Sequence, residues 1–397
     1  MRFGHHSVVF NSVASRAFGR KWTQLGRYGV CSREAEVHSL ITLLGSRDSP
    51  TDGVQDYCEF LRRALDHRGV RLEIARVDWK QKGWSTSLRE LWNSSKAWRG
   101  KWVILQYTAL GWSRRGCPFG VLVVLAILRC RGVRCGVLFH EPHQTGGTGW
   151  LGRIRGACQS WVIRTSYSLA SKAIFADPLE MIHWLPEDDS KGTFIPIGSN
   201  VPERLSQAAI RPNEDCTKTV AIFCITGAPH ASIEIEEIAY TARCAVSSGA
   251  PLRFVFFGRG TSEAREQIEC AFRDIPVEIS VLGLLDASKI GGILANSDVM
   301  LCVRGAIFPR RGSALAGISC GLPIVCYRGP ESTFPITEAG LELVPYRDRD
   351  ALGKAVHRVL SDDRLRQALR RRSFQAHYNY FSWDSIAARF ARELFDE

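Results

Sequence analysis

The chain has 397 residues, which is long for a single hydrophobic core and favours two domains. Hydrophobic residues make up 45% of it and charged residues 23%, the proportions of a soluble globular protein, and no apolar run approaches the roughly 20 residues that a membrane-spanning helix needs. Lys and Arg outnumber Asp and Glu by 52 to 40, so the net charge of +12 favours anionic partners such as phosphates, nucleic acid or an acidic membrane surface.

The amino-terminal segment holds several arginines and a lysine but no acid before Glu34. This composition resembles that of a transit peptide, or of a basic arm that touches lipid. We expect residues 1–38 to be a basic, disordered extension outside the fold, and a targeting segment or an early start codon are the alternatives.

Alternating apolar and helical segments begin at residue 39. Residues 39–77 predict a strand, a loop rich in Gly, Pro and Asp, an amphipathic helix that ends at Gly69, and a second strand. Such a βαβ unit indicates a parallel sheet. The apolar runs 102–107, 119–128 and 135–143 continue the alternation, and the run 119–128 fits either a core helix or a buried strand.

A second alternating series begins near residue 218. Short apolar runs bounded by Gly, Asp or Pro predict further strands, and helices are expected between them. The preceding segment, 195–219, is rich in Pro, Ser and Asn, as interdomain linkers are. We therefore expect an α/β protein with two tandem Rossmann-like, doubly wound domains, 39–202 and 203–378, and ligands in the cleft at the carboxyl ends of their strands.

Several stretches match, in order, the landmarks of one known family. They are GSRDSPTDGVQDY (45–57), HEPH (140–143), FIPIGSNVP (194–202), FFGRG (256–260), VLGLLDASKIGGILANSDVML (281–301), SCGLPIV (319–325) and YFSWDSIAARFAREL (380–394). In this order they resemble a GT-B glycosyltransferase of the large family-4 type, which uses nucleotide-sugar donors. The resemblance implies a closing helix over 379–397 that crosses back to the N-terminal domain.

A candidate anion site lies in the stretch that begins with Arg310 and Arg311. Gly312 and Ser313 follow, and we expect Ser313 to cap a short helix that Gly321 ends. Backbone N–H groups at a helix start, together with arginines, suit a diphosphate, although solvated loop arginines are the alternative. The resemblance adds further donor contacts at Gly258, Arg259, Gly260, Gly283, Leu284 and Glu331.

The chain departs from the family at two places. The usual signature has two glutamates eight residues apart, one on the donor sugar and one on the ribose, and here those positions are Phe308 and Ala316. The family's Arg/Lys pair after the first donor-domain strand also lacks a clear counterpart, and His230 lies in that loop. The resemblance therefore supports the shape of the donor domain more firmly than its usual hydroxyl contacts.

His140 ends an apolar strand on the N-domain side, and we predict it as the catalytic residue. A histidine at a strand end in a cleft can donate a hydrogen bond to a donor sugar or phosphate, and a buried structural histidine is the alternative. Family members line the acceptor side with the first loop, which here carries Asp48, Asp52, Gly53 and Gln55. Asp52 can equally be the N-cap of the helix that follows it.

Two other patterns are given structural interpretations. The triplet DRD at 348–350 has the spacing of a metal-binding D-x-D, but Asp350 directly precedes an amphipathic stretch and is expected to cap a helix. The basic amphipathic segment 153–172 could lie on an anionic membrane, but packing on the N-domain sheet is favoured. The 13 cysteines include no C-x-x-C pair, so neither a zinc cluster nor any other metal site is expected.

These features predict a glycosyltransferase that moves a sugar from a nucleotide diphosphate to a hydroxyl acceptor, such as a glycan, a lipid-linked sugar or a small molecule, without a metal or other cofactor. The resemblance implies retention of the anomeric configuration. Two alternatives remain open: a degenerate GT-B protein that binds nucleotide or a partner without turnover, and a hydrolysing sugar-nucleotide epimerase. We expect a cytoplasmic protein with no nucleic-acid partner, and peripheral contact with the inner membrane face stays open.

Overall fold

The computed structural model describes residues 38–47, 52–144, 149–186, 189–201, 217–227, 230–246 and 249–396. The predicted extension lies outside these residues except for its last member, His38, which begins the first strand rather than ending the extension. Asp48 and the predicted domain boundary at 202/203 also lie outside the described residues.

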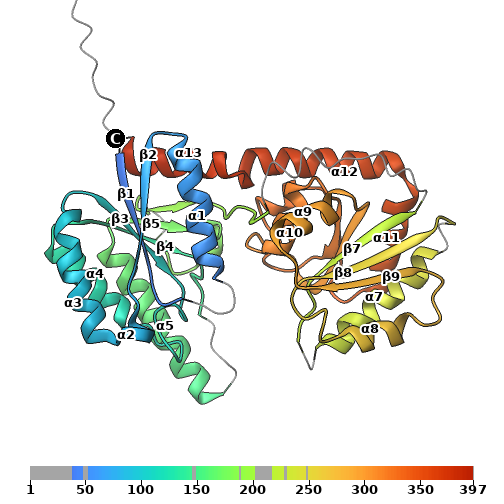
Figure 1. Cartoon of the computed structure of the whole chain (residues 1–397), viewed down its shortest axis with the longest axis horizontal. Helices are drawn as coiled ribbons and strands as arrows, with labels where there is room; N and C mark the ends of the chain where they lie inside the picture. Colours follow the sequence, from blue (N-terminus) through green and yellow to red (C-terminus); the bar gives the residue numbers. More distant parts are fainter. Residues whose placement is uncertain are drawn as a thin grey trace, which may run out of the picture. The chain divides into compact units, whose positions relative to one another are not determined.

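Six parallel strands form the first sheet, in the order β2-β1-β3-β4-β5-β6. They are β1 (His38–Leu44), β2 (Val70–Arg76), β3 (Trp102–Tyr107), β4 (Arg134–Phe139), β5 (Lys172–Phe175) and β6 (Gly192–Phe194). The connections contain α1 (Gly53–Asp66), α2 (Trp79–Lys82), α3 (Trp84–Ser94), η1 (Ser95–Trp98), α4 (Gly120–Cys130), α5 (Trp150–Leu169) and η2 (Leu179–Met181) (Figure 1). The predicted βαβ start is confirmed, and the ambiguous run 119–128 is helical.

The second sheet also has six parallel strands, in the order β12-β11-β10-β7-β8-β9. They are β7 (Lys218–Phe223), β8 (Leu252–Phe257), β9 (Glu278–Gly283), β10 (Val299–Ala306), β11 (Ile324–Tyr327) and β12 (Leu341–Val344). The helical segments are α7 (Ala231–Val246), α8 (Arg265–Phe272), α9 (Ala287–Ala295), α10 (Gly312–Ser319), η3 (Ile336–Glu338), α11 (Arg349–Ser361) and α12 (Asp363–Ala376). Two doubly wound Rossmann-like sheets are therefore present, as the sequence predicts.

Burial on both faces of the sheets explains why their strands are continuous apolar runs rather than alternating ones. In β1, Ile41 and Leu43 join one core cluster, while Leu40 and Leu44 join another. Successive side chains of a strand point to opposite faces, so each of these clusters covers one face of the first sheet.

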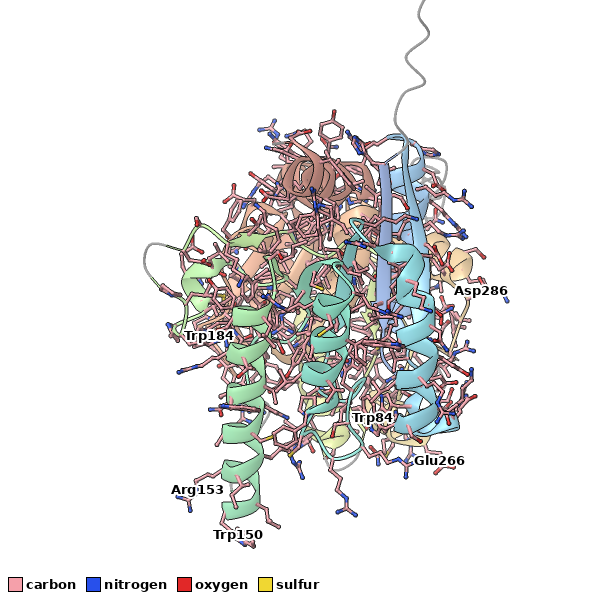
Figure 2. All side chains as sticks on the ribbon, turned by 90° about the vertical axis from the view of Figure 1, so that its left-hand side faces the viewer. Trp84, Trp150, Arg153, Trp184, Glu266 and Asp286 are labelled. Carbon is pink, nitrogen blue, oxygen red and sulfur yellow. The ribbon has the colours of Figure 1, made fainter. Side chains whose placement is uncertain are left out.

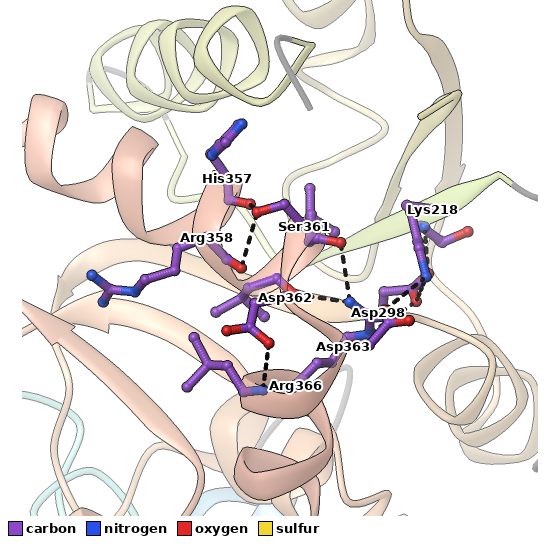
Figure 3. A network of polar contacts seen from close by, with 12 residues as sticks. Lys218, Asp298, His357, Arg358, Ser361, Asp362, Asp363 and Arg366 are labelled. Atoms are coloured by element: carbon purple, nitrogen blue, oxygen red, sulfur yellow. Dashed lines mark hydrogen bonds and ion pairs between the residues drawn. The ribbon is translucent and has the colours of Figure 1, made fainter. Parts of the chain in front are cut away.

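A polar network ties the amino-terminal edge of the second sheet to α12 (Figure 3). Asp298 lies just before β10, accepts a hydrogen bond from the backbone N–H of Thr219 at 2.9 Å, and is 3.4 Å from Lys218 Nζ. Arg366 is buried, lies 3.5 Å from the Asp298 carboxylate, and donates to the carbonyl oxygen of Val359 at 3.0 Å. Ligands of such sheets bind at the opposite, carboxyl edge, so this network is structural.

The last helix, α13 (Trp383–Phe395), follows the π-helical segment η4 (His377–Phe381) and packs on α1 of the first domain. Trp383 Nε1 donates to the carbonyl oxygen of Ser199 at 2.8 Å, and its ring stacks on Phe60 with 5.4 Å between centroids. Phe381 is instead buried in a core cluster of the second domain. The predicted closing helix is confirmed, and these two aromatic side chains anchor it in different domains.

The start of α10 differs from the prediction. The helix begins at Gly312, with Arg311 in the N-cap position, and no side chain caps it. Ser313 lies inside the first turn, so its expected role as the cap is wrong. Gly321 has a φ of 66° and follows the helix, which agrees with its predicted role as the stop.

Two other helix predictions have different outcomes. Asp348, not Asp350, caps α11, because its side chain accepts from the N–H of Ala351 at 2.9 Å. Asp350 lies in the first turn and accepts a hydrogen bond from the hydroxyl of Tyr240. The segment 153–172 does pack on its domain, since Val162 and Ile163 of α5 are buried in the core of the first sheet.

Candidate functional site

A cavity of about 660 Å³ lies at the carboxyl ends of strands from both sheets. The first domain contributes the ends of β1, β3 and β4 and the start of α1, and the second contributes the end of β7, α9, α10 and Arg310. Of the residues predicted from the sequence, His140, Arg310, Gly312, Asp52 and Gly53 line this cavity.

His140 is held in one orientation by a chain of hydrogen bonds. Its Nε2 lies 2.7 Å from Gln106 Oε1, and Gln106 Nε2 donates to Thr42 Oγ1 at 2.8 Å. Burial, and then the charge of Arg310, lower the pKa of His140 to about 3, so the ring is neutral at ordinary pH. With Nε2–H donating to Gln106, Nδ1 is left as an acceptor of hydrogen bonds. The predicted role as a donor does not fit this tautomer.

Tyr57 of α1 lies beside His140, with the two rings edge to face and their centroids 5.2 Å apart. Its side chain is 4% exposed and lines the cavity, and its hydroxyl has no hydrogen-bond partner among the described residues. Burial raises the pKa of Tyr57 well above its usual range, so the phenol stays protonated. A ligand hydroxyl in the cavity would satisfy this buried group.

The acceptor-side residues of the first loop are mostly engaged within the chain. Asp52 caps α1 by accepting from the N–H of Gln55 at 3.0 Å, and its carboxylate pairs with Arg76 at 3.0 Å. The Gln55 side chain also accepts from Arg76, at 2.9 Å. The capping interpretation of Asp52 is therefore confirmed. Asp56, one turn on, faces the cavity, and burial followed by the charge of Asp52 raises its pKa.

Arg310 joins the two domains. Its Nε donates to the carboxylate of Asp177, which follows β5 of the first sheet and is 2% exposed. The other oxygen of Asp177 is 3.7 Å from His143 Nε2. Arg310 is thus already paired with a carboxylate, whereas the sequence suggested a free cation for phosphate.

Arg311 points elsewhere and has no such partner. Its guanidinium lies 4.6 Å from the ring centroid of Phe308 and donates to the carbonyl oxygen of Ala306 at 3.3 Å, while its Nε is buried without a hydrogen bond. Burial lowers the pKa of Arg311, with the charge of Arg304 as a further cause. Arg304, near the end of β10, donates from Nε to Thr226 Oγ1 at 3.1 Å. Neither arginine forms an ion pair with any described carboxylate.

The predicted glycines of the donor domain shape the backbone at this edge. Gly258 and Gly260 have φ angles of 90° and 84°, and a Cβ on Gly260 would meet the carbonyl oxygen of Ile225 at 2.2 Å. Gly258 donates from its N–H to the carbonyl oxygen of Gly283 at 2.7 Å. These glycines let the loops after β7, β8 and β9 pack closely.

Four other predicted residues are exposed and do not line the cavity: Arg259, Leu284, Glu331 and His230. Leu285, next to Leu284, does line it. Whether any of the four contacts a donor stays a prediction. Among the described residues, no group of three or more His, Cys, Asp or Glu side chains could hold a metal ion.

Sequence reasoning missed Gln106, Tyr57, Asp177 and Arg304. Gln106 is the lone polar residue in the apolar run 102–107, and Arg304 is the first charged residue after the run 299–303. Both positions carried a signal, since a polar group at the carboxyl end of a buried strand is a common ligand position. Asp177 likewise follows an apolar run.

No protein-family model matches the chain, and no curated protein sequence matches it. Solved structures do. Sucrose-phosphate synthase from Thermosynechococcus elongatus is 15% identical, with 90% of this chain and 99% of that one covered and a TM-score of 0.59. HepE from Anabaena, bound to UDP, is 12% identical, with 91% and 100% covered and a TM-score of 0.60. A Listeria monocytogenes protein assigned as a UDP-N-acetylglucosamine 2-epimerase is 12% identical, with 90% and 97% covered and a TM-score of 0.58. The chain thus has the GT-B fold.

Proposed function

We propose that the protein is a glycosyltransferase that moves a sugar from a nucleotide diphosphate to a hydroxyl acceptor. The observation that carries this proposal is the pair Arg304 and Arg311 at the carboxyl edge of the second sheet, beyond the residues that line the cavity. Neither cation forms an ion pair with a described carboxylate. A partly buried, unpaired cation is costly, and a diphosphate would supply the missing anion. The similar HepE structures are complexes with UDP and with UDP-glucose.

The first domain supports the hydroxyl-binding part of the proposal. Nδ1 of His140 and the hydroxyl of Tyr57 are polar groups at the cavity that a sugar or acceptor hydroxyl would satisfy. A histidine with a pKa of about 3 is a weak base, so we assign His140 to positioning a hydroxyl. The departing phosphate would then take the acceptor proton, which agrees with retention of configuration and needs no metal.

A hydrolysing sugar-nucleotide epimerase is the second candidate. Such an enzyme needs carboxyl groups in its cleft, and Asp56 and Glu141 both line the cavity. The raised pKa of Asp56 is a feature of carboxyl groups that exchange protons. The similar Listeria protein makes the same reaction worth testing beside glycosyl transfer.

The test begins with binding. UDP, GDP and ADP are added singly and the melting temperature is measured, with and without a chelator. We expect one nucleoside diphosphate to stabilise the protein by about 2.7 kcal/mol at a hundred times its dissociation constant. Arg311→Ala should abolish most of this effect, while Arg273→Ala, an exposed arginine after α8, should not.

Product analysis then separates the reactions. The matching nucleotide sugar is incubated with a panel of hydroxyl acceptors, and NMR follows the anomeric and C2 protons. Transfer with retention is expected; release of a free, C2-inverted sugar would identify the epimerase. Binding without any turnover would favour the degenerate alternative, and a melting temperature that no nucleotide changes would contradict the donor site itself.

A further inference from the structure

An apolar surface is exposed on the first domain, away from its core. It consists of Phe119, Val123, Trp150, Leu151, Ile154 and Trp161, which are 47% to 65% exposed. The rings of Phe119 and Trp161 contact each other with centroids 5.9 Å apart, so the start of α4 and the first twelve residues of α5 form one surface. We call this set the α5 surface. Exposed apolar patches of this kind mark sites that bind proteins or membranes.

The periodicity of α5 explains how the helix can be packed and exposed at once. Trp150, Ile154 and Trp161 are spaced by four and seven residues and so share one face of the helix. Gly152 and Gly156 are buried, which brings that side of the helix close against its domain. Figure 2 shows Trp150 and Arg153 at the free end of α5, where they point away from the neighbouring helices. The apolar side chains on the outward face of α5 are therefore separate from the domain core.

The charge around this surface is one-sided. Residues 91–176 contain twelve Lys or Arg and a single acid, Glu141, so this segment carries +11 of the chain's net charge of +12. Arg114, Arg115, Arg153 and Arg164 are exposed beside the apolar side chains. None of these four forms an ion pair with any described residue.

We propose that the α5 surface binds a lipid bilayer that contains anionic lipids. Tryptophans and aliphatic side chains between arginines, with no acid, are the composition of helices that lie in the interface of a membrane. The apolar side chains would enter the headgroup level, and the arginines would pair with lipid phosphates. No described helix is long and apolar enough to cross a membrane, so the contact would be peripheral.

One exposed apolar residue of the same domain lies at the cavity itself. Leu110 lies in the segment between β3 and α4, is 64% exposed, and also lines the cavity. Under the proposed function, a hydroxyl acceptor anchored in a membrane is therefore a substrate class to test. That consequence rests on the proposed function, whereas binding to lipid does not.

The experiment is co-sedimentation of the full chain with vesicles, without nucleotide or acceptor. One set is phosphatidylcholine alone, and in the other phosphatidylglycerol replaces a third of it. We expect binding to the anionic vesicles only, weakening with added salt. The double variant Trp150→Ala/Ile154→Ala should bind at least tenfold more weakly, since it removes two large apolar side chains that would otherwise be buried in the bilayer. Arg153→Gln/Arg164→Gln should lose a similar factor and much of the salt dependence.

Matched controls come from the second domain. Ile233→Ala removes an exposed isoleucine of α7, and Arg371→Gln removes an exposed arginine of α12; both should bind as the unchanged protein does. All variants should keep its melting temperature, because the substituted side chains are on the surface. Binding that neither double variant weakens would place lipid contact elsewhere in the chain and overturn the proposal. So would equal binding to neutral vesicles, no binding at all, or an oligomer that the apolar double variant dissociates. Failure of glycosyl transfer would leave the lipid result standing.

Discussion

Replacing Arg311 by Met should leave the free protein at least as stable as before while weakening nucleotide binding. In the folded chain Arg311 gains one hydrogen bond at 3.3 Å, worth about 1 kcal/mol, and a cation–π contact with Phe308 worth roughly 0.5–1 kcal/mol. Against this, its Nε is buried with no partner in the part of the chain that the structure describes, which costs about 1–3 kcal/mol. The pKa of Arg311 is lowered, first by burial, so the charged side chain is destabilised in the folded protein as well. Met keeps the length of the aliphatic stem, so the net change is near zero.

Nucleotide binding should respond in the opposite direction. A charge-assisted hydrogen bond to phosphate contributes about 1.5–3 kcal/mol, so Arg311→Met should raise the dissociation constant by roughly one to two decades. Urea denaturation measures the first effect and calorimetric titration with a nucleoside diphosphate the second, with Arg273→Met as the control for both. A variant that is destabilised by more than about 2 kcal/mol and binds nucleotide normally would refute this reasoning and make Arg311 a structural residue.

Two further predictions concern the closing helix and the cavity. Trp383→Ala should lower the free energy of unfolding by about 3–5 kcal/mol and expose the first domain to protease, because this buried ring packs against Phe60. Tyr378→Ala is the control, since Tyr378 is 78% exposed. Equal stability of both variants would contradict the packing of α13 on the first domain. The pKa of His140 is lowered to about 3 in the folded protein, so below pH 6.5 the unfolded chain takes up a proton at this residue that the folded chain does not. The stability that neutral His140 contributes is therefore fully present above pH 6.5 and is lost as the pH falls toward 3. Between pH 7.5 and 5.5 the difference in unfolding free energy between the unchanged protein and His140→Gln should shift by about 1.4 kcal/mol, measured in urea, and no shift would mean an ordinary pKa.

The fold could be predicted because its strands are buried on both faces and bounded by Gly, Pro or Asp. Their order along the chain then implies parallel sheets. The run 119–128 was ambiguous for a physical reason, since a buried strand and a helix both contain continuous apolar residues. The exposure of Phe119 and Val123 could not be predicted either, because it depends on which side of α4 the neighbouring helices cover.

The site was harder to predict because its partners come from distant segments. Arg310 and Arg311 are adjacent in sequence, and the natural expectation is that they act together. In the structure Arg310 pairs with Asp177 of the first domain, whereas Arg311 turns toward β10 and Arg304. Only the packing of the two sheets decides this division. A similar limit applies to Tyr57: it lies on the buried side of the predicted amphipathic helix, but its unpaired hydroxyl could not be read from the sequence.

Phe308 gives the missing glutamate a physical meaning. It occupies the position of a family carboxylate, and its ring lies 4.6 Å from the Arg311 guanidinium and 5.5 Å from that of Arg310. An aromatic face holds a cation without neutralising it, so the charge of Arg311 stays available to a ligand. A carboxylate here would pair with Arg311 and compete with phosphate.

Restoring the family residue tests this interpretation. Phe308→Glu should weaken binding of a nucleoside diphosphate by about tenfold. The new carboxylate would pair with Arg311, and phosphate could bind only by breaking this ion pair, at a cost of roughly 1.4 kcal/mol. Phe308→Leu, which removes the ring but adds no charge, should change the affinity much less. Calorimetric titration of both variants with the diphosphate and with its sugar ester separates the cases. If Phe308→Glu instead bound the nucleotide sugar more tightly, the chain would keep the family's donor geometry, and the phenylalanine would simply lack the contact that the family's glutamate makes with the sugar.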